Sequence, residues 1–363
     1  MKFTILGQGT ALPPFSISQA DAALYAATYS GHDDDQRRLI PALYRMSGVK
    51  RRHSILLTGL EGEAARDPSF PSPTSPDDRG PPTSTRMRLY EQHAPVLAAQ
   101  AARNALSASR VEAEDITHLI TVSCSGFAAP GVDIQLIRDL ELRRTVERIH
   151  VGFMGCHGAL NGLRAARSIA ESDAEARILV AAVELCSLHY HYGWDPEKVV
   201  ANALFADGAA ALIGGAAPDG APGAWRIGAT GSCLIPDSED AMSWSVRDHG
   251  FAMTLSPRVP DLIATHLGAW MGTWLGTVGL GTQSVRSWAV HPGGPRILTA
   301  TAKALALEPD ALDVSKEVLR DYGNMSSPTI LFILEQLRQR GAPLPCVALG
   351  FGPGLMAEAV LFL

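Results

Sequence analysis

The sequence predicts an α/β fold in which helices cover buried sheets. The chain has 363 residues, 46% of them hydrophobic, which exceeds the usual size of a single core. Short apolar segments such as 116–123 and 178–183 are typical of buried strands. Segments with alanine and leucine at helical spacing, such as 86–108 and 158–170, lie between them. Strands that alternate with helices indicate layers of helices packed on sheets.

Taken in chain order, each element follows from apolar periodicity and from the turn residues beside it. The first half predicts a strand 1–7, helix 18–46, a Pro-, Ser-, Asp- and Gly-rich surface loop 67–85, helix 86–108, strand 116–123, helix 134–140, strand 149–153, helix 158–170, and strands 178–183 and 209–213. The second half predicts strand 225–230, helix 260–277, strand 287–290, helices 294–305 and 329–339, and strands 346–349 and 357–363. The Gly/Pro-rich segment 214–223 separates two predicted halves, 1–222 and 223–363.

Composition narrows the class of protein. A net charge of −6 argues weakly against nucleic acid as a partner. No apolar run approaches the roughly 18 residues of a membrane helix, and the first residues do not resemble a secretory signal. The five cysteines are scattered without a CxxC pair, which indicates neither a disulfide framework nor a metal site. We therefore expect a cytoplasmic protein with reduced thiols.

One cysteine lies in a setting that favours reactivity. Cys156, in Val-Gly-Phe-Met-Gly-Cys-His-Gly-Ala (151–159), falls between a predicted strand and a predicted helix. The free N–H groups and the positive dipole end at the start of a helix favour a thiolate. A nucleophile is one interpretation, and a buried, inert cysteine is the other.

Two further residues have the chemistry that such a thiol needs. His291 ends an apolar strand before Pro-Gly-Gly-Pro, at a strand tip where functional residues of α/β folds collect. Its imidazole could pair with the thiol and donate to an oxyanion, or it could be a capping or core histidine. Asn324, in Gly-Asn-Met-Ser-Ser, could donate to a thioester carbonyl or serve as a helix N-cap.

Five motifs together resemble the type III polyketide synthases, the chalcone and stilbene synthase-like enzymes. They are the Cys156 segment, Ala203-Leu-Phe-Ala-Asp-Gly-Ala-Ala210, His291-Pro-Gly-Gly-Pro, Gly323-Asn-Met-Ser-Ser and Gly350-Phe-Gly-Pro-Gly354, in the right order over nearly the whole chain. The resemblance implies a thiolase-like αβαβα fold of two similar halves, the first with Cys156 and the second with His291 and Asn324. It also implies a homodimer that uses coenzyme A thioesters and needs no metal or other cofactor.

The resemblance assigns roles to the same three residues. Cys156 would take an acyl-CoA starter as a thioester, and His291 and Asn324 would drive the decarboxylation of malonyl-CoA. The resulting carbanion would lengthen the chain by two carbons, and a pyrone-, resorcinol- or phenol-type product would be released.

Residues that shape the cavity or bind coenzyme A follow from the same resemblance. Phe205 matches an aromatic gatekeeper, and Met253 replaces a second one. Ala129 falls where the family often has a methionine that crosses the dimer interface. The other expected cavity residues are Trp244, Cys124, Cys186, His189 and Ser326, and the basic cluster Arg45, Lys50, Arg51 and Arg52 corresponds to the CoA-phosphate region.

Three alternatives remain at this point. An initiating ketoacyl synthase shares the fold and the triad but takes its extender from an acyl carrier protein. A non-catalytic partner subunit would be expected to lack one of the three residues. A cysteine hydrolase would release free acid without chain extension.

Overall fold

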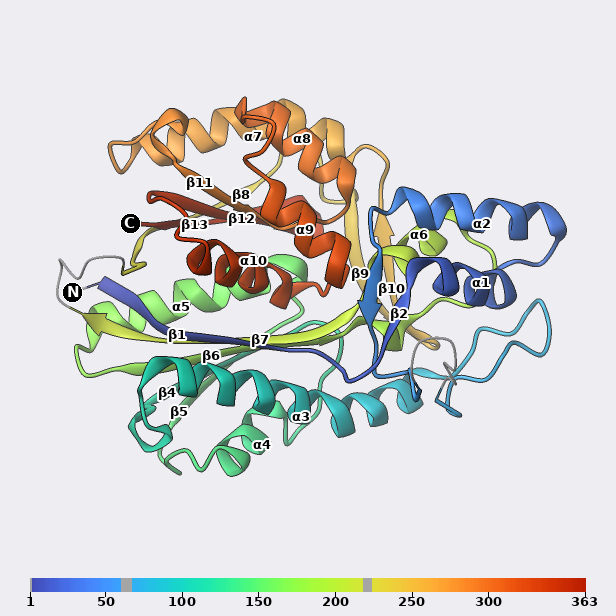
Figure 1. Ribbon diagram of the computed structural model, residues 1–363, viewed down its shortest axis with the longest axis horizontal. Coiled ribbons are helices and arrows are strands. Elements are labelled where there is room, and N and C mark those ends of the chain that lie inside the picture. Colours follow the sequence, from blue (N-terminus) through green and yellow to red (C-terminus); the bar gives the residue numbers. More distant parts are fainter. Residues whose placement is uncertain (1, 60–66, 218–223) are drawn as a thin grey trace.

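The computed structural model describes residues 2–59, 67–217 and 224–363, and these form two sheets with helices outside and between them (Figure 1). The first sheet has five strands in the order β1 (Lys2–Ala11), β7 (Asp207–Ala217), β6 (Arg177–Leu185), β4 (His118–Ser123) and β5 (Glu147–Gly152). Strands β6, β4 and β5 run parallel, while β7 is antiparallel to both of its neighbours.

The second sheet has four strands in the order β11 (Ser287–Val290), β12 (Cys346–Gly352), β13 (Met356–Phe362) and β8 (Ile227–Leu234). Strands β11 and β12 are parallel, and the other neighbours are antiparallel. Both sheets contain continuous buried apolar runs, because each is covered on two faces.

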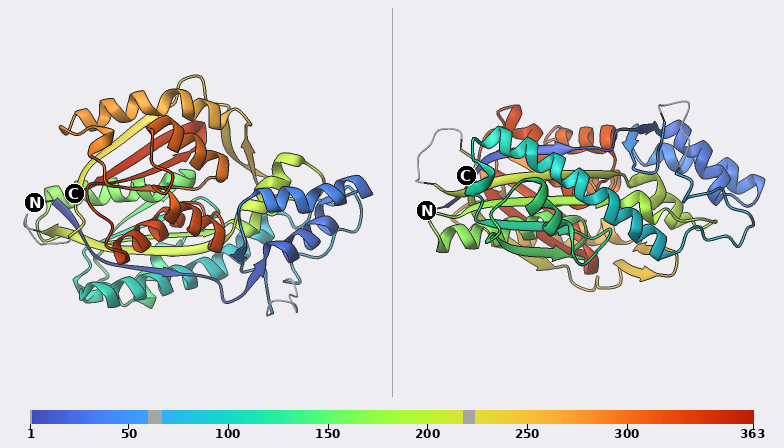
Figure 2. Two further views of the ribbon diagram at one scale, coloured as in Figure 1. Left: turned by 45° about the horizontal axis from the view of Figure 1, so that its top comes forward. Right: turned by 90° about the horizontal axis from the view of Figure 1, so that it is seen from below.

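Helices form the other three layers (Figures 1 and 2). Helices α3 (Thr83–Ser109) and α4 (Val132–Asp139) cover the outside of the first sheet, and α7 (Val259–Gly276) and α8 (Pro295–Leu305) cover the outside of the second. Helices α5 (Gly158–Ser172) and α10 (Ser327–Gln339) lie between the sheets, in one apolar core with strands from both. This is the five-layer αβαβα arrangement that the family resemblance implied.

A lateral extension lies at one end of the layers, on the right of Figure 1. It contains α1 (Gln19–Ser30), α2 (Asp34–Met46) and α6 (Pro196–Leu204), which share a small core of their own. Two short ribbons accompany them: β2 (Ser16–Ser18) with β3 (Arg51–His53), and β9 (Met242–Arg247) with β10 (Gly250–Leu255). Helix α9 (Asp313–Tyr322) leads from the second sheet toward this region.

Most predicted elements are present, and the differences have physical reasons. The predicted helix 18–46 is two helices, because Asp33 caps a new helix after the break at Gly31. The predicted loop 67–85 is already helical from Thr83. Sequence reasoning missed α6, α9 and the β9–β10 hairpin. Among the described residues, no helix is long and apolar enough to cross a membrane.

Candidate active site

Cys156 lies at a sharp turn between β5 and α5. Phe153 and Gly155 both adopt positive φ angles, 59° and 70°, and a single 3₁₀ turn at Gly155–His157 leads into the helix. A side chain at position 155 would meet Pro353 at 2.5 Å, so only glycine fits there. The turn places Cys156 where β5 ends, with 8% of the residue exposed.

His291 follows directly after β11. Its backbone N–H donates to the Leu349 carbonyl at 2.8 Å, which extends the pairing with β12 by one residue. The residue is 1% exposed, and neither ring nitrogen has a hydrogen-bond partner in the described part of the chain. A buried imidazole with two unsatisfied nitrogens is costly, and this is typical of a group that meets a ligand.

Asn324 is fixed by its backbone and by its own side-chain oxygen. Its N–H donates to the Leu204 carbonyl at 2.9 Å, and its carbonyl accepts from the Ala206 N–H at 2.9 Å. Its Oδ1 accepts from the Ser326 N–H at 2.8 Å, while helix α10 begins later, at Ser327. The N-cap interpretation is therefore wrong, and the side chain forms a local turn that holds the amide in place.

Cys156, His291 and Asn324 line one small cavity of about 30 Å³, although the two halves of the chain supply them separately.

Burial raises the pKa of the Cys156 thiol to about 11, and hydrogen bonds with Ser326 and Asn324 act in the opposite direction. Burial also lowers the pKa of His291 to about 3, with a further contribution from His157. Desolvation thus outweighs the helix-end effect that we expected to favour a thiolate. Both shifts come from burial, and each favours the neutral form of its group.

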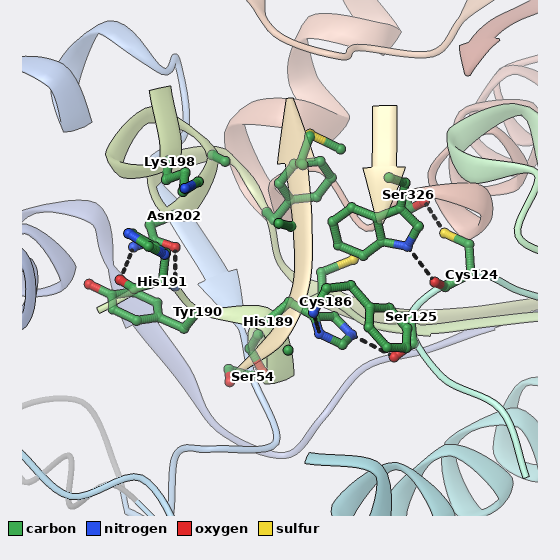
Figure 3. A pocket seen from close by; sticks show the side chains of 18 of the residues that line it. Ser54, Cys124, Ser125, Cys186, His189, Tyr190, His191, Lys198, Asn202 and Ser326 are labelled. Carbon is green, nitrogen blue, oxygen red and sulfur yellow. Dashed lines mark hydrogen bonds between the residues drawn. The ribbon is translucent and has the colours of Figure 1, made fainter. Parts of the chain in front are cut away.

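A second cavity of about 340 Å³ adjoins the first, and Cys156, Phe205, Met242 and Met253 line both. Its volume falls within the roughly 300–1,000 Å³ of small-molecule sites. The other predicted cavity residues also line it: Cys124, Cys186, His189, Trp244 and Ser326. Figure 3 shows Cys124 and Ser326 on one side of this cavity, with Cys186 and His189 in the middle.

One wall of the larger cavity is held rigidly. Trp244 donates from Nε1 to the Cys124 carbonyl at 2.7 Å, and its ring packs edge-on against His189 and Phe251. His189 bonds to the Ser125 carbonyl at 2.6 Å through Nε2 and accepts from the Phe251 N–H at 2.9 Å through Nδ1. Both nitrogens of His189 are therefore occupied, which fixes the ring in the cavity wall, and its role in substrate binding stays a prediction.

A buried carboxylate supports the same wall, because it holds the backbone of Cys124 and Ser125. Glu184, fully buried near the end of β6, accepts from the N–H groups of Cys124 and Ser125 at 2.9 and 2.8 Å. It also accepts from the hydroxyls of Ser125 and Ser327, each at 2.6 Å. Burial raises the pKa of Glu184, and these hydrogen bonds oppose the rise. Sequence reasoning missed it, although a lone acid within the apolar run Val183-Glu184-Leu185 was a signal.

The predicted phosphate-binding cluster divides into two groups. Arg52 is buried, donates to the carbonyls of Asn202 and Phe205, and lies over the Tyr44 ring at 5.4 Å. Both carbonyls bind the same nitrogen, Nη1, so the side chain is tied to the backbone there, and its role as a phosphate ligand stays a prediction.

The other members of the cluster, Arg45, Lys50 and Arg51, are exposed. Beside Lys50, Val49 packs on Leu204, which lines the small cavity. The backbone beside Lys50 therefore lies near the small cavity. Among the described residues, no cluster of His, Cys, Asp or Glu could hold a metal ion.

Sequence reasoning also missed Phe251 and Met242. They precede Met253 and Trp244 by two residues on β10 and β9, so each pair shares a face of the hairpin. The pattern Phe251-x-Met253-x-Leu255 alternates with the period of a strand.

A buried cysteine, histidine and asparagine between two α/β halves define an enzyme of the thiolase-like fold that transfers acyl groups. Comparison with known proteins identifies the family to which this enzyme belongs. Family models for the N-terminal and C-terminal domains of chalcone and stilbene synthases match residues 1–218 and 227–363. The chain belongs to this family and is a type III polyketide synthase, a CoA-dependent acyltransferase.

Individual relatives agree with this placement. The chain is 31% identical to the alpha-pyrone synthesis polyketide synthase-like Pks18 of Mycobacterium tuberculosis, over 99% of this chain and 90% of the relative. It is 34% identical to a 1,3,6,8-tetrahydroxynaphthalene synthase of Streptomyces peucetius, over 97% and 90%. The crystal structure of PKS-I from the brown alga Ectocarpus siliculosus superimposes with a TM-score of 0.92 at 28% identity, covering 99% of this chain and 98% of that one. The ketoacyl synthase alternative is not favoured.

Proposed function

We propose that the enzyme loads an acyl-CoA starter on Cys156 and extends it with malonyl-CoA, using His291 and Asn324. The observation that carries the proposal is the small cavity lined by these three buried residues from two halves of the chain. The two ring nitrogens of His291 have no partner among the described residues, so they are free to meet a thioester.

Loading begins with a neutral pair. The Cys156 sulfur attacks the thioester carbonyl of the starter, and its proton passes to His291. The bond between the carbonyl carbon and the CoA sulfur then breaks, CoA takes the proton, and the acyl group remains on Cys156. The raised pKa of Cys156 makes this proton transfer necessary, because the free thiol is the weaker nucleophile.

Extension uses the imidazole and the amide as donors. Malonyl-CoA binds with its thioester oxygen toward His291 and Asn324, and the bond to the carboxylate breaks with release of carbon dioxide. The electron pair moves onto the thioester oxygen as an enolate, which the two donors stabilise. The enolate carbon then attacks the acyl group on Cys156, the carbon–sulfur bond breaks, and the thiolate leaves.

The product class rests on the relatives and on the cavity. The named relatives make an alpha-pyrone and a tetrahydroxynaphthalene. We propose that this enzyme releases a cyclised pyrone, resorcinol or phenol, and that Phe205 and Met253 form the gate through which the chain enters the larger cavity. Exposed Arg45, Lys50 and Arg51 are proposed to bind the CoA phosphates beside the small cavity.

We also propose that the enzyme is a cytoplasmic homodimer. Within each chain, the proposed boundary between the two halves, 1–222 and 223–363, lies outside the described residues. Strand β5 is an edge strand of the described sheet, and Ile149, Phe127 and Met154 leave 44%, 53% and 41% of their surfaces exposed around it. An exposed apolar edge of this kind favours pairing with a second copy. Ala129 is exposed in the same segment, which supports its proposed place at the interface. Light scattering of the purified protein, compared with an Ile149→Lys variant, tests the dimer.

Mass spectrometry of reactions with malonyl-CoA and a panel of starter CoA thioesters tests the proposed chemistry. We expect products that are longer by two-carbon units. Cys156→Ala should end condensation but leave some decarboxylation of malonyl-CoA, whereas Asn324→Ala should lose both. Chain extension by the Cys156→Ala variant would refute the covalent mechanism. Turnover that requires a malonyl-carrier protein would favour the alternative function, a ketoacyl synthase. Release of free acid without chain extension would indicate a hydrolase.

A further inference from the structure

A cluster of aromatic rings connects the wall of the larger cavity with the exposed edge of the first sheet. Phe251, on β10, lines this cavity and is 4% exposed. Its ring stacks on His189, with the ring centroids 4.2 Å apart and an angle of 14° between the planes. It also stacks on Phe127, with the centroids 5.9 Å apart and again an angle of 14°. Phe251 therefore lies against one ring of the cavity wall and one ring of the sheet edge.

Phe127 and Phe153 form the outer part of this aromatic cluster. Phe127 follows β4, and Phe153 follows β5 in the turn that leads to Cys156. The Phe153 ring lies 5.5 Å from that of Phe251 and 6.3 Å from that of Phe127. Phe127 and Phe153 are 53% and 36% exposed, and neither is among the described residues that line the two cavities. The Phe127 ring is therefore connected to the larger cavity through Phe251.

The backbone of Phe251 is held separately from its ring. Its N–H donates to Nδ1 of His189 at 2.9 Å, and the residue pairs with Val246 across the hairpin. These interactions leave the side-chain torsion angles free, so the neighbouring side chains decide where the ring lies. On the cavity side the neighbours are His189 and Trp244, whose ring meets Phe251 edge-on at 5.7 Å. Toward the sheet edge, the ring packs on Phe127 and Phe153.

The position of the Phe251 ring affects how much space a growing chain has. Stacked ring pairs are stabilised by an amount that corresponds to about a twofold to tenfold change in an equilibrium between two positions. Without the Phe127 ring, space opens beside Phe251 toward the sheet edge, and the Phe251 ring can turn away from His189. The cavity then extends between these two rings and holds a longer chain.

We propose that Phe127 is a positioning residue that limits product length, because it holds Phe251 against His189 and so keeps the wall of the larger cavity in place. The inference rests on the proposed function, because it requires that chains grown on Cys156 extend into this cavity. Phe127 would then select the product without touching it.

The test measures the product lengths of a Phe127→Ala variant by liquid chromatography with mass spectrometry, using one starter CoA thioester and malonyl-CoA. We expect the fraction of products longer than those of the unaltered enzyme to rise about twofold or more. The kcat/KM for the starter should change by less than about twofold, because Phe127 lies outside both cavities. Phe127→Tyr, which keeps the ring, should retain the original products.

Two further comparisons show whether Phe127 acts through Phe251. In a Phe251→Ala background, Phe127→Ala should cause no additional change in product length, because its partner is already absent. Ile149→Ala is the matched control, since it removes an exposed apolar side chain from the same edge but outside the aromatic cluster. It should leave the products unchanged. If Phe127→Ala does not fold, Phe127→Leu takes its place and should shift the products in the same direction.

Each other outcome overturns the inference. Unchanged product lengths in the Phe127 variants refute it, as does a full second shift when Phe127→Ala is added to Phe251→Ala. Light scattering at the assay concentrations separates the ring contact from subunit association. If the products change only where the variant dissociates, association sets the wall and the ring contact does not. If the unaltered enzyme forms no extended product from any starter, the proposed function fails first, so the two failures are distinguishable.

Discussion

Replacing Trp244 by alanine should enlarge the larger cavity and lengthen the products. The indole lines this cavity and is held by the Cys124 carbonyl at 2.7 Å and by the rings of His189 and Phe251. Its removal opens on the order of 150 Å³, the size of an engineered cavity that binds benzene. The cavity of about 340 Å³ would therefore grow by nearly half.

The added space sets the expected change in product. At roughly 25 Å³ per non-hydrogen atom, close to the share of a water molecule in the liquid, about six more atoms fit. Each extension adds two carbons and one oxygen, so products up to two units longer are expected. Liquid chromatography with mass spectrometry of reactions with a fixed starter measures this. Trp244→Phe, which keeps a ring and loses the N–H donor, is the control and should change product length little. An unchanged product profile for Trp244→Ala would refute the placement of this ring as the limit of the cavity.

Other predictions concern titration and stability. The pKa of His291 is lowered to about 3, so the unfolded chain binds a proton that the folded one does not, and folding stability falls as pH drops below about 6.5. Between pH 7.5 and 5.5 this residue alone should lower the free energy of unfolding by about 1.4 kcal/mol. Urea unfolding at the two pH values should therefore show a loss that is smaller by this amount in the His291→Asn variant. An identical loss in the variant and the unaltered enzyme would contradict the prediction. Because hydrogen bonding to Ser326 lowers the pKa of Cys156, Ser326→Ala should move the pH midpoint of Cys156 alkylation upward, measured on its peptide by mass spectrometry. A downward shift would reverse the assignment. Buried Arg86 donates to the carbonyls of Pro81, Leu188 and Tyr190 at 2.8, 2.6 and 3.0 Å. Arg86→Met should therefore lower the free energy of unfolding by at least about 3 kcal/mol. A loss below about 1 kcal/mol would show that water replaces these bonds.

The layers and the three central residues could be predicted from sequence because their signals are local. Apolar runs in the sequence predict the buried strands. Cys156, His291 and Asn324 each lie in a distinctive turn with glycine or proline. Their meeting in one small cavity depends on two sheets that pack through α5 and α10, which no local pattern shows. The family resemblance supplied that step.

The walls were harder to predict because their behaviour depends on partners far away in the chain. The resemblance predicted His189 as a cavity residue, but no local pattern shows that both of its nitrogens bond to backbone groups of Ser125 and Phe251. Arg52 belonged to a basic run in sequence, yet its side chain turns inward to carbonyl groups. The thiol of Cys156 shows the same limit, because burial, which a turn sequence does not report, decides its pKa.

The order of strands in the second sheet has a consequence for how the enzyme is made. Its two inner strands, β12 and β13, lie between β11 and β8 and are synthesised after every other strand described. Until residues 346–362 leave the ribosome, β11 has no neighbour in this sheet, and the backbone of His291 lacks its anchor at Leu349. The nascent chain therefore carries Cys156 but cannot catalyse condensation, and the core that the first half shares with β12 and β13 is still incomplete. A premature stop before residue 346 should leave an inactive product. Its strands β11 and β8 would lack their neighbours in the sheet, and their exposed edges would favour aggregation.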